Sequence, residues 1–374
     1  MAESYFLLQW LQAMFVGTSA AAYALANNNN NKENNMSRKT TPPPPPPRRL
    51  LRSVLYVPAS DMEGMRQALL SAADAVVLDL EDTVAPHDKD VARANVITLL
   101  QGLAARTVPR AVPTVVVRIN CMDSTPWGVL DLRALASVHC DAVLLPKVED
   151  PARVHAAMDI LERHRTAAGT TKALWCMVET PRGVQRVDAI ADMDGVAALV
   201  FGSNDLTTEL KGRQTESREA LLYALSKVVN AARAAGKLAV DGVYGNPQVD
   251  NVEGLTRACQ QGRDLGFDGK TMLHASQIDV ANRTFRPGPE EVANARKAIH
   301  AYEGQTGMIV VDGQLISRPR VERAKILVAE AEDIERIVQG RKQPSFRAGG
   351  DAAAPRFQQR TKSWTAVGAE CARH

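Results

Sequence analysis

The chain of 374 residues carries 45 basic and 42 acidic side chains, a formal net charge of +3. This near balance gives no indication of a nucleic-acid or membrane-surface partner. The cysteines are scattered and form no C-x-x-C pair, which argues against a zinc site or a disulfide framework and suits a reducing compartment. They are Cys121, Cys140, Cys176, Cys259 and Cys371.

Residues 1–52 lack the pattern of a folded domain. An apolar stretch, Tyr5–Ala26, is followed by the asparagine run Asn27–Asn31 and the proline run Pro42–Pro47. The apolar stretch has no basic residues before it and contains several polar ones, which disfavours a signal peptide or a membrane span. Met36 is an alternative start, after which the leader is basic and loosely resembles an organelle transit peptide. We expect a disordered or targeting tail, and both a cytoplasmic and a mitochondrial location stay open.

From Ser53 onward, short apolar runs alternate with helical patterns such as Asp150–His164, Ser217–Ala235 and Asn251–Leu265. This alternation predicts an α/β protein, a (β/α)8 TIM barrel spanning residues 53–285. An open doubly wound sheet is the alternative, but no Gly-x-Gly-x-x-Gly follows the first run. The predicted strands are Ser53–Pro58, Ala75–Leu80, Thr114–Ile119, Ala142–Pro146, Ala173–Val178, Ala198–Phe201, Leu238–Val243 and Thr271–His274.

Residues 286–338 predict a helix–hairpin–helix unit. A helix over Glu290–Tyr302 precedes two apolar runs joined by Asp312-Gly313, and a second helix starts at Arg318. Asp-Gly supplies the positive φ angles of a type I′ turn. The unit is too small to fold alone, so we expect a lid on its own barrel or on a neighbour's. Residues 339–374 are rich in Gly, Ala, Arg and Gln, and we expect a disordered tail.

Two consecutive predicted strands each end in a carboxylate, Glu179 after Ala173–Val178 and Asp205 after Ala198–Phe201. In α/β enzymes the ends of parallel strands surround the active site, so these carboxylates can converge. Two hard oxygen ligands with room for water and substrate suit Mg²⁺. The alternative is that Asp205 caps a helix starting at Leu206 and that Glu179 is a solvated loop residue.

Other polar residues follow the predicted strands, and their number calls for partners, because an isolated buried charge is costly. Arg118 has the planar fork that fits a carboxylate or an enolate oxygen. An internal salt bridge from Arg118 to Asp79 or Glu81 is an equally open alternative. Lys147 can pair with Glu149 or Glu179, and His274 can act as a structural hydrogen-bonding group. The full set is Tyr56, Ser60, Asp79, Glu81, Asp82, Arg118, Asn120, Lys147, Glu149, Glu179, Asp205, Asp241, Tyr244 and His274.

Several stretches together resemble the citrate lyase beta-subunit family of the HpcH/HpaI aldolase superfamily. The resemblance covers about residues 50–338. It implies a (β/α)8 barrel, Mg²⁺ as cofactor, and lyase activity on 3-hydroxyacyl-CoA thioesters such as citryl-, malyl- and citramalyl-CoA. The matching stretches are Arg52-Ser-Val-Leu-Tyr-Val-Pro58, Leu78-Asp-Leu-Glu-Asp82, Val84-Ala-Pro86, Val117-Arg-Ile-Asn120, Leu145-Pro-Lys-Val-Glu149, Val178-Glu-Thr180, Phe201-Gly-Ser-Asn-Asp205 and Gly266-Phe-Asp-Gly-Lys270.

The resemblance also implies roles for individual residues and a mode of assembly. It makes Glu179 and Asp205 the Mg²⁺ ligands, and it makes Arg118 and Asp82 the candidate catalytic residues. The keto-acid part of the substrate would contact Arg118 and Glu179. The substrate pocket would be lined by Tyr56 and by the loop with Asp241 and Tyr244. A homotrimer in which each lid completes a neighbour's site is also implied.

The chain departs from the family pattern in three places. Pro58-Ala59-Ser60 lacks the usual glycine, and Leu273-His-Ala275-Ser-Gln277 lacks the usual proline. In the lid stretch Gly313–Pro319, Ser317 stands where the family has an aspartate regarded as the general acid/base. A hydroxyl has the wrong pKa to replace a carboxylate, and losing a general acid/base costs about 10²–10⁴-fold in rate.

The sequence therefore predicts a Mg²⁺-dependent carbon–carbon lyase that cleaves a 3-hydroxyacyl-CoA into an acyl-CoA and a 2-keto acid. One alternative is a metal-dependent aldolase acting on 2-keto acids without CoA, which needs no lid aspartate. Another is a non-catalytic relative that binds CoA esters. No nucleic-acid or membrane partner is expected for the mature domain.

Overall fold

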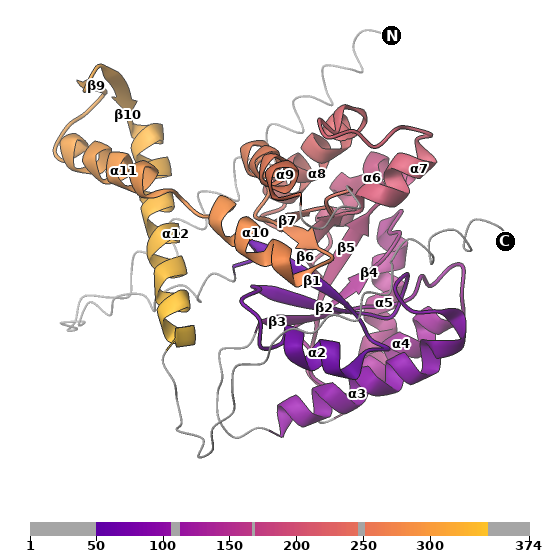
Figure 1. Ribbon diagram of the computed structural model, residues 1–374. Helices are drawn as coiled ribbons and strands as arrows, with labels where there is room; N and C mark the ends of the chain where they lie inside the picture. Colours follow the sequence, from indigo (N-terminus) through magenta and orange to yellow (C-terminus); the bar gives the residue numbers. More distant parts are fainter. Residues whose placement is uncertain (1–49, 106–112, 167–168, 246–250, 343–374) are drawn as a thin grey trace, which may run out of the picture. The chain divides into compact units, whose positions relative to one another are not determined.

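The computed structural model describes residues 50–105, 113–166, 169–245 and 251–342. Parallel strands β1 to β8 pair in sequence order, and β8 pairs with β1, which closes a barrel. Figure 1 shows these strands surrounded by helices. The predicted (β/α)8 barrel is confirmed. The strands are β1 Ser53–Pro58, β2 Ala75–Asp79, β3 Thr114–Arg118, β4 Ala142–Leu145, β5 Ala173–Val178, β6 Val196–Phe201, β7 Leu238–Asp241 and β8 Gly269–Met272.

The helices of the barrel begin at caps that the sequence supplies. The Asp150 side chain accepts from the backbone N–H of Arg153 at the start of α5, and Asn251 caps α9 in the same way. The barrel helices are α2 Met62–Ala68, α3 Lys89–Ala104, α4 Trp127–Leu135, α5 Pro151–Arg163, α6 Pro181–Ala191, α7 Ser203–Glu209, α8 Leu222–Ala234, α9 Val252–Leu265 and α10 Ile278–Thr284, with short 3-10 turns η1 Pro86–Asp88, η2 Glu219–Leu221 and η3 Ala275–Gln277.

Several predicted elements differ at their ends from those observed. β6 starts at Val196 rather than Ala198, and β7 ends at Asp241 rather than Val243. The strand predicted at Thr271–His274 is β8, which starts at Gly269 and ends at Met272, so His274 lies in the following turn. The helix predicted over Ser217–Ala235 begins only at Leu222, because Arg218 has a left-handed φ of 53° that interrupts the helical path.

The apolar side chains form two layers separated by the sheet. Alternate strand residues such as Val116, Leu144 and Val200 fill the interior of the barrel. Their sequence neighbours, for example Val117 and Leu199, pack outward against the helices. Burial on both faces explains why the strands are continuous apolar runs with polar residues only near their ends.

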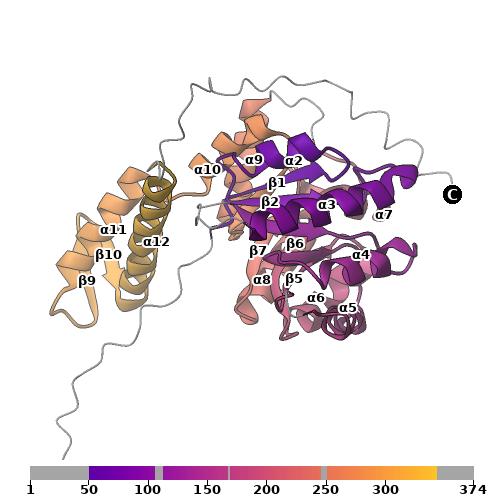
Figure 2. The same cartoon turned by 90° about the horizontal axis from the view of Figure 1, so that it is seen from below.

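Residues 286–338 contain the expected helix–hairpin–helix, with α11 Pro289–Tyr302, strands β9 Met308–Val311 and β10 Gln314–Ser317, and α12 Arg318–Lys342. Asp312 and Gly313 have φ angles of 48° and 75°, as a type I′ turn requires. Figure 2 shows the hairpin beside α11 and α12, and these elements share small apolar clusters of their own. No helix in the described ranges has the length and apolar character of a membrane span.

Both predicted tails overlap folded structure at their inner ends. Arg52, placed in the N-terminal tail, is buried, and its Nε and Nη2 donate to Asp74 at 2.7 and 2.9 Å. Residues 339–342, placed in the C-terminal tail, continue α12. The remainder of each predicted tail lies outside the described residues.

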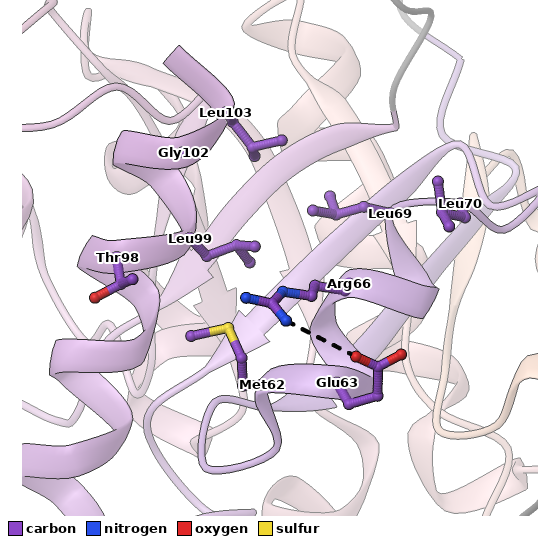
Figure 3. A pocket seen from close by; sticks show the side chains of 9 residues that line it. All are labelled: Met62, Glu63, Arg66, Leu69, Leu70, Thr98, Leu99, Gly102 and Leu103. Carbon is purple, nitrogen blue, oxygen red and sulfur yellow. Dashed lines mark ion pairs between the residues drawn. The ribbon is translucent and has the colours of Figure 1, made fainter. Parts of the chain in front are cut away.

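A groove of about 400 Å³ lies between α2 and α3 (Figure 3). Its walls are mainly apolar, with Met62, Leu69 and Leu99 among the lining residues. Its charged pair, Glu63 and Arg66, is exposed, with 4.0 Å between Oε2 and Nη1. None of the polar strand-end residues lines this groove.

Candidate functional site

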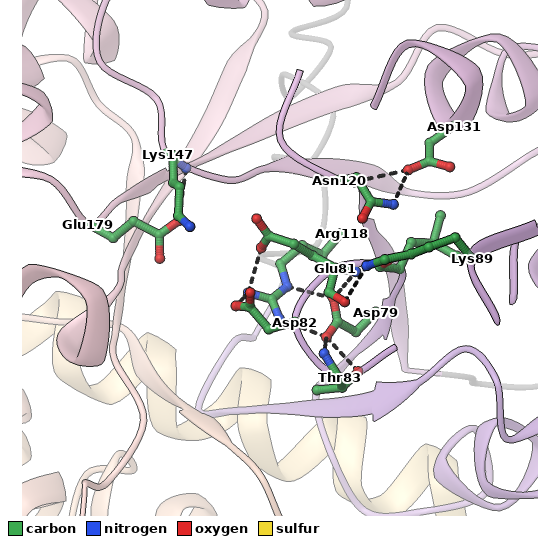
Figure 4. Close-up of polar contacts among 11 residues, drawn as sticks. Asp79, Glu81, Asp82, Thr83, Lys89, Arg118, Asn120, Asp131, Lys147 and Glu179 are labelled. Carbon is green, nitrogen blue, oxygen red and sulfur yellow. Dashed lines mark hydrogen bonds and ion pairs between the residues drawn. The ribbon is translucent and has the colours of Figure 1, made fainter. Parts of the chain in front are cut away.

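Arg118, the last residue of β3, is surrounded by three carboxylates from the neighbouring strand end (Figure 4). Its Nε and Nη2 donate to the two oxygens of Asp79, both at 2.6 Å. Its Nη1 lies 2.9 Å from Glu81 Oε2 and 3.0 Å from Asp82 Oδ2. The alternative of an internal salt bridge is therefore confirmed. The guanidinium is fixed in orientation by the bidentate pair, and Asp82 is its solvent-facing partner, with 57 % of the side chain exposed.

Further hydrogen bonds hold the carboxylate of Asp79. It accepts from the backbone N–H groups of Glu81 and Thr83 and from the Thr83 hydroxyl. Burial opposes ionisation, but Arg118 and these bonds outweigh it, so the pKa of Asp79 lies below its ordinary value. Lys89 fixes the same turn by donating to the carbonyl oxygens of Leu80 and Glu81.

Glu81 is the least satisfied member of this cluster. Its Oε2 is buried and accepts no hydrogen bond of good geometry from any described residue, although Arg118 lies within ion-pair distance. Burial raises the pKa of Glu81 well above its ordinary value, and the nearby carboxylates of Asp82 and Glu179 add to the rise.

Glu179 directly follows β5 and is buried, only 4 % exposed. Its Oε1 accepts from the backbone N–H of Lys147 at 2.8 Å. Burial, and then the charge of Asp205, raise the pKa of Glu179 to about 7. A Cβ at Gly202 would lie 2.5 Å from Glu179 Oε2, so glycine is required for this carboxylate to occupy its place. Glu179 is therefore not a solvated loop residue.

Asp205 lies in the first turn of α7, which starts at Ser203 and is capped by Gly202. The alternative in which Asp205 caps a helix starting at Leu206 is therefore wrong. The Nζ of Lys147 is 3.2 Å from Asp205 Oδ2. Lys147 pairs neither with Glu149 nor through its side chain with Glu179, because its backbone takes a left-handed φ of 49° that presents the N–H, rather than the ammonium, to Glu179.

The donor set fits a divalent cation. Five carboxylates, Asp79, Glu81, Asp82, Glu179 and Asp205, lie with three cationic side chains, Arg118, Lys89 and Lys147. Among the described residues, no three or more His, Cys, Asp or Glu side chains are grouped as metal ligands, and Glu179 with Asp205 gives two candidate carboxylates. Two carboxylates, with water and substrate oxygens completing the shell, are typical of Mg²⁺.

Tyr56 in β1 lies beneath Arg118, whose Cζ is 5.0 Å from the centre of its ring. Its hydroxyl is buried and has no hydrogen-bond partner among the described residues. Burial raises the pKa of Tyr56, so the hydroxyl stays protonated and is available as a donor.

Asp241 differs from its expected place on the pocket wall. It is fully buried, with Arg218 Nη1 at 2.7 Å and Lys270 Nζ at 2.8 Å. The Asp241 carboxylate forms ion pairs with these two buried cations. The prediction that Asp241 contacts the substrate is therefore wrong, and the residue belongs to a structural ion cluster. Tyr244 is only partly buried and lines a cavity next to α7, where its hydroxyl accepts from Asn251.

Two further candidates, His274 and Ser317, lie outside this cluster. His274 caps η3 with a bond between its Nδ1 and the N–H of Ser276, as expected of a structural hydrogen-bonding group, and burial lowers its pKa. Ser317 is the last residue of β10, paired with Met308, and α12 begins at the next residue.

Three buried cations were not predicted as site residues. Arg218 comes from an irregular stretch after α7, while Lys270 lies in a strand whose predicted start was two residues late. Lys89 lies at the first position of a helix, where lysine is ordinarily solvated. A lysine inside a strand was the available signal for Lys270, since a buried lysine needs a carboxylate partner.

The protein is a closed eight-stranded α/β barrel, and its strand ends carry an acidic cluster and an arginine of fixed orientation. These features place it in the class of TIM-barrel proteins with a candidate divalent-metal site. Residues 52–275 match the family described as HpcH/HpaI aldolase/citrate lyase, and the chain belongs to that family.

Curated relatives and a solved structure share most of this chain. A (3S)-malyl-CoA thioesterase of Cereibacter sphaeroides is 40% identical over 288 residues, which cover 76% of this chain and 95% of the relative. A citrate lyase subunit beta of Leuconostoc mesenteroides is 34% identical, covering 74% and 91% of the two chains. The solved CitE protein of Mycobacterium tuberculosis, in complex with magnesium, acetoacetate and coenzyme A, is 30% identical, with a TM-score of 0.63 over 75% of this chain and 97% of that one.

Proposed function

We propose that the protein is a Mg²⁺-dependent carbon–carbon lyase that cleaves a 3-hydroxyacyl-CoA of the malyl, citramalyl or citryl type into an acyl-CoA and a 2-keto acid. The observation that carries the proposal is the buried Glu179 beside Asp205, close to an arginine fixed by three carboxylates.

Glu179 and Asp205 would hold the Mg²⁺. When bound, the ion supplies Lewis-acid polarisation of the hydroxy-acid oxygens of the substrate. Arg118 keeps its charge under all working conditions and is oriented by Asp79, so it would stabilise the thioester enolate that forms as the C–C bond breaks. The substrate hydroxyl loses a proton and the enolate carbon gains one. Asp82, which contacts Arg118 and is open to solvent, is the candidate group for exchanging these protons.

The names of similar proteins support the substrate class. The C. sphaeroides relative is named for malyl-CoA, and the M. tuberculosis structure contains magnesium, acetoacetate and coenzyme A. Each match covers nearly the full length of the similar protein, so the whole barrel is shared. We extend this to a homotrimer in which the lid of one protomer completes the site of the next, which light scattering on the purified protein would test.

Hydrolysis of the same thioester is the second candidate, favoured by the name of the 40%-identical relative, a thioesterase. In this reaction water adds to the thioester carbonyl and the CoA thiol leaves, so malyl-CoA would give malate and free CoA. The same two carboxylates and Arg118 would bind the substrate. A lyase, by contrast, would give glyoxylate and acetyl-CoA with no free thiol.

The two reactions are separated by measuring both products from one substrate. Malyl-CoA and citramalyl-CoA would be incubated with the protein, with and without Mg²⁺, while keto acid and free thiol are quantified in parallel. We expect keto acid to appear only with Mg²⁺, and Glu179→Gln to abolish it, while the exposed Glu63→Gln leaves it unchanged. Thiol released without keto acid would replace the lyase proposal by the thioesterase.

Ser317 is tested in the same assay. If the lid hydroxyl limits proton transfer, Ser317→Asp should raise turnover by about 10²-fold. Turnover of free hydroxy-keto acids but of no CoA ester by the wild type would instead identify a CoA-independent aldolase. Tight binding of CoA esters with no turnover in either variant would identify a non-catalytic relative.

A further inference from the structure

A second cavity, with polar residues in its lining, lies beside α7. It has a volume of about 330 Å³ and is lined from α7, the loop after it, η2 and the end of β7. We call it the α7–β7 cavity. Its polar lining includes Ser203, Arg213, Gln214, Arg218 and Tyr244, and its apolar lining is Leu221, Val243 and Ala258.

An unsatisfied hydroxyl lies at the wall of this cavity. Ser203 is 5 % exposed, and its Oγ has no hydrogen-bond partner among the described residues. Gly242 packs so closely that an added Cβ would lie 2.0 Å from this Oγ, which fixes the hydroxyl in place. A buried hydroxyl without a partner costs about 1–3 kcal/mol, so a ligand that accepts its hydrogen bond would be favoured.

The charge around the cavity is positive. Arg218 and Lys270 share one carboxylate, Asp241, and all three side chains are at least nine-tenths buried. Burial lowers the pKa of Lys270, and the neighbouring Arg218 adds to the lowering. An anion in the adjacent cavity would offset this surplus.

Two guanidinium groups can reach an anion there. Arg213 is exposed and makes no hydrogen bond or ion pair with any residue of the described ranges. Arg218 Nη2 makes one long bond, 3.4 Å to the carbonyl of Ala258, and retains a second N–H. Glu216 also lines the cavity, but its carboxylate pairs with Arg257 at 2.8 Å. The negative charge of Glu216 is therefore already neutralised by Arg257.

We propose that the α7–β7 cavity binds the oxyanion group of a small organic ligand, a carboxylate or a phosphate, whose apolar part contacts Leu221 and Val243. Ser203 and Arg213 donate to the oxyanion, and Arg218 supplies the charge behind it. Glu179, Asp205 and Arg118 are not among the residues that line the cavity, and the proposal does not depend on the lyase proposal.

The test uses the full chain carrying Glu179→Gln, without Mg²⁺, so that anion binding to a metal at the central site is removed. Malonate and inorganic phosphate are titrated by calorimetry at low ionic strength. We expect saturable binding of at least one probe, which identifies the preferred oxyanion. Adding Arg213→Gln should weaken it by about tenfold, the loss of one charge-assisted bond. Adding Ser203→Ala should weaken it by about fivefold.

The matched control is Arg163→Gln on α5, which removes an exposed arginine of the same kind, 76 % exposed and paired with Asp159. It should leave the affinity unchanged. Absence of saturable binding for both probes, or an equal loss in Arg163→Gln and Arg213→Gln, would overturn the proposal. Circular dichroism melts of each variant establish that the compared proteins are folded. Because the assay contains no acyl-CoA, its failure leaves the test of the lyase reaction untouched.

Discussion

The raised pKa of Glu179 has a direct consequence for stability. Its pKa rises from 4.5 to about 7 on folding, so the folded protein keeps a proton that the unfolded chain has lost. The contribution of Glu179 to stability is therefore largest at low pH and is lost as the pH rises through this window. At about 1.36 kcal/mol per pKa unit the full effect is about 3 kcal/mol, and linkage places most of it between about pH 5 and pH 8.

Glu179→Gln removes this titration while keeping the shape of the side chain. The free energy of unfolding would be measured by urea denaturation in EDTA for wild type and variant across this pH range. We expect the difference in the free energy of unfolding, variant minus wild type, to increase by about 2–3 kcal/mol from about pH 5 to pH 8. Subtraction cancels the titrating groups that do not interact with Glu179, whereas Glu81, whose pKa Glu179 helps to raise, contributes to the difference.

The matched control is Glu63→Gln, whose exposed carboxylate should give a flat difference curve. Added Mg²⁺ should stabilise the wild type at about pH 8 and not the Glu179→Gln variant, because a ligand that binds only the folded state raises its stability. A difference curve that stays flat for Glu179→Gln would refute the burial and charge argument for this carboxylate.

Two further predictions concern the groups around the site. Asp79→Asn should destabilise the protein by about 3–5 kcal/mol in urea unfolding, because it leaves the buried guanidinium of Arg118 without its bidentate partner. Gly202→Ala should lower Mg²⁺ affinity by more than about tenfold in calorimetry, because its Cβ would lie 2.3 Å from the Cβ of Glu179 and force this ligand to move.

Each of these substitutions has a matched control substitution elsewhere in the chain. Asp82→Asn removes a partner of the same arginine that is 57 % exposed, and it should cost less than about 1 kcal/mol. Gly102→Ala, in α3 with nothing within 4 Å of the added Cβ, should leave Mg²⁺ binding unchanged and stabilise the helix by about 0.5–1 kcal/mol. Equal effects within either pair would contradict the local roles of Asp79 and Gly202.

The amino-acid pattern alone was enough to predict the barrel and its two candidate metal ligands. Strands buried on both faces must be apolar runs, and polar residues are tolerated only where the strands end, so periodicity located both the sheet and the residues at its edge. Glu179 and Asp205 were recognisable because each follows such a run. Arg118 was recognisable as a cation at a strand end, but the sequence left open whether it binds an anion or forms an internal salt bridge.

The partners of these side chains became known only from the folded barrel. Asp241 lies at a strand end like Glu179, yet it is enclosed, because Arg218 enters from a loop 23 residues earlier and Lys270 lies on the adjacent strand. Lys147 faces Asp205 because its backbone takes a left-handed conformation that no sequence period reveals. Ion pairs depend on distances of a few ångströms between distant segments, and these are fixed only when the barrel closes.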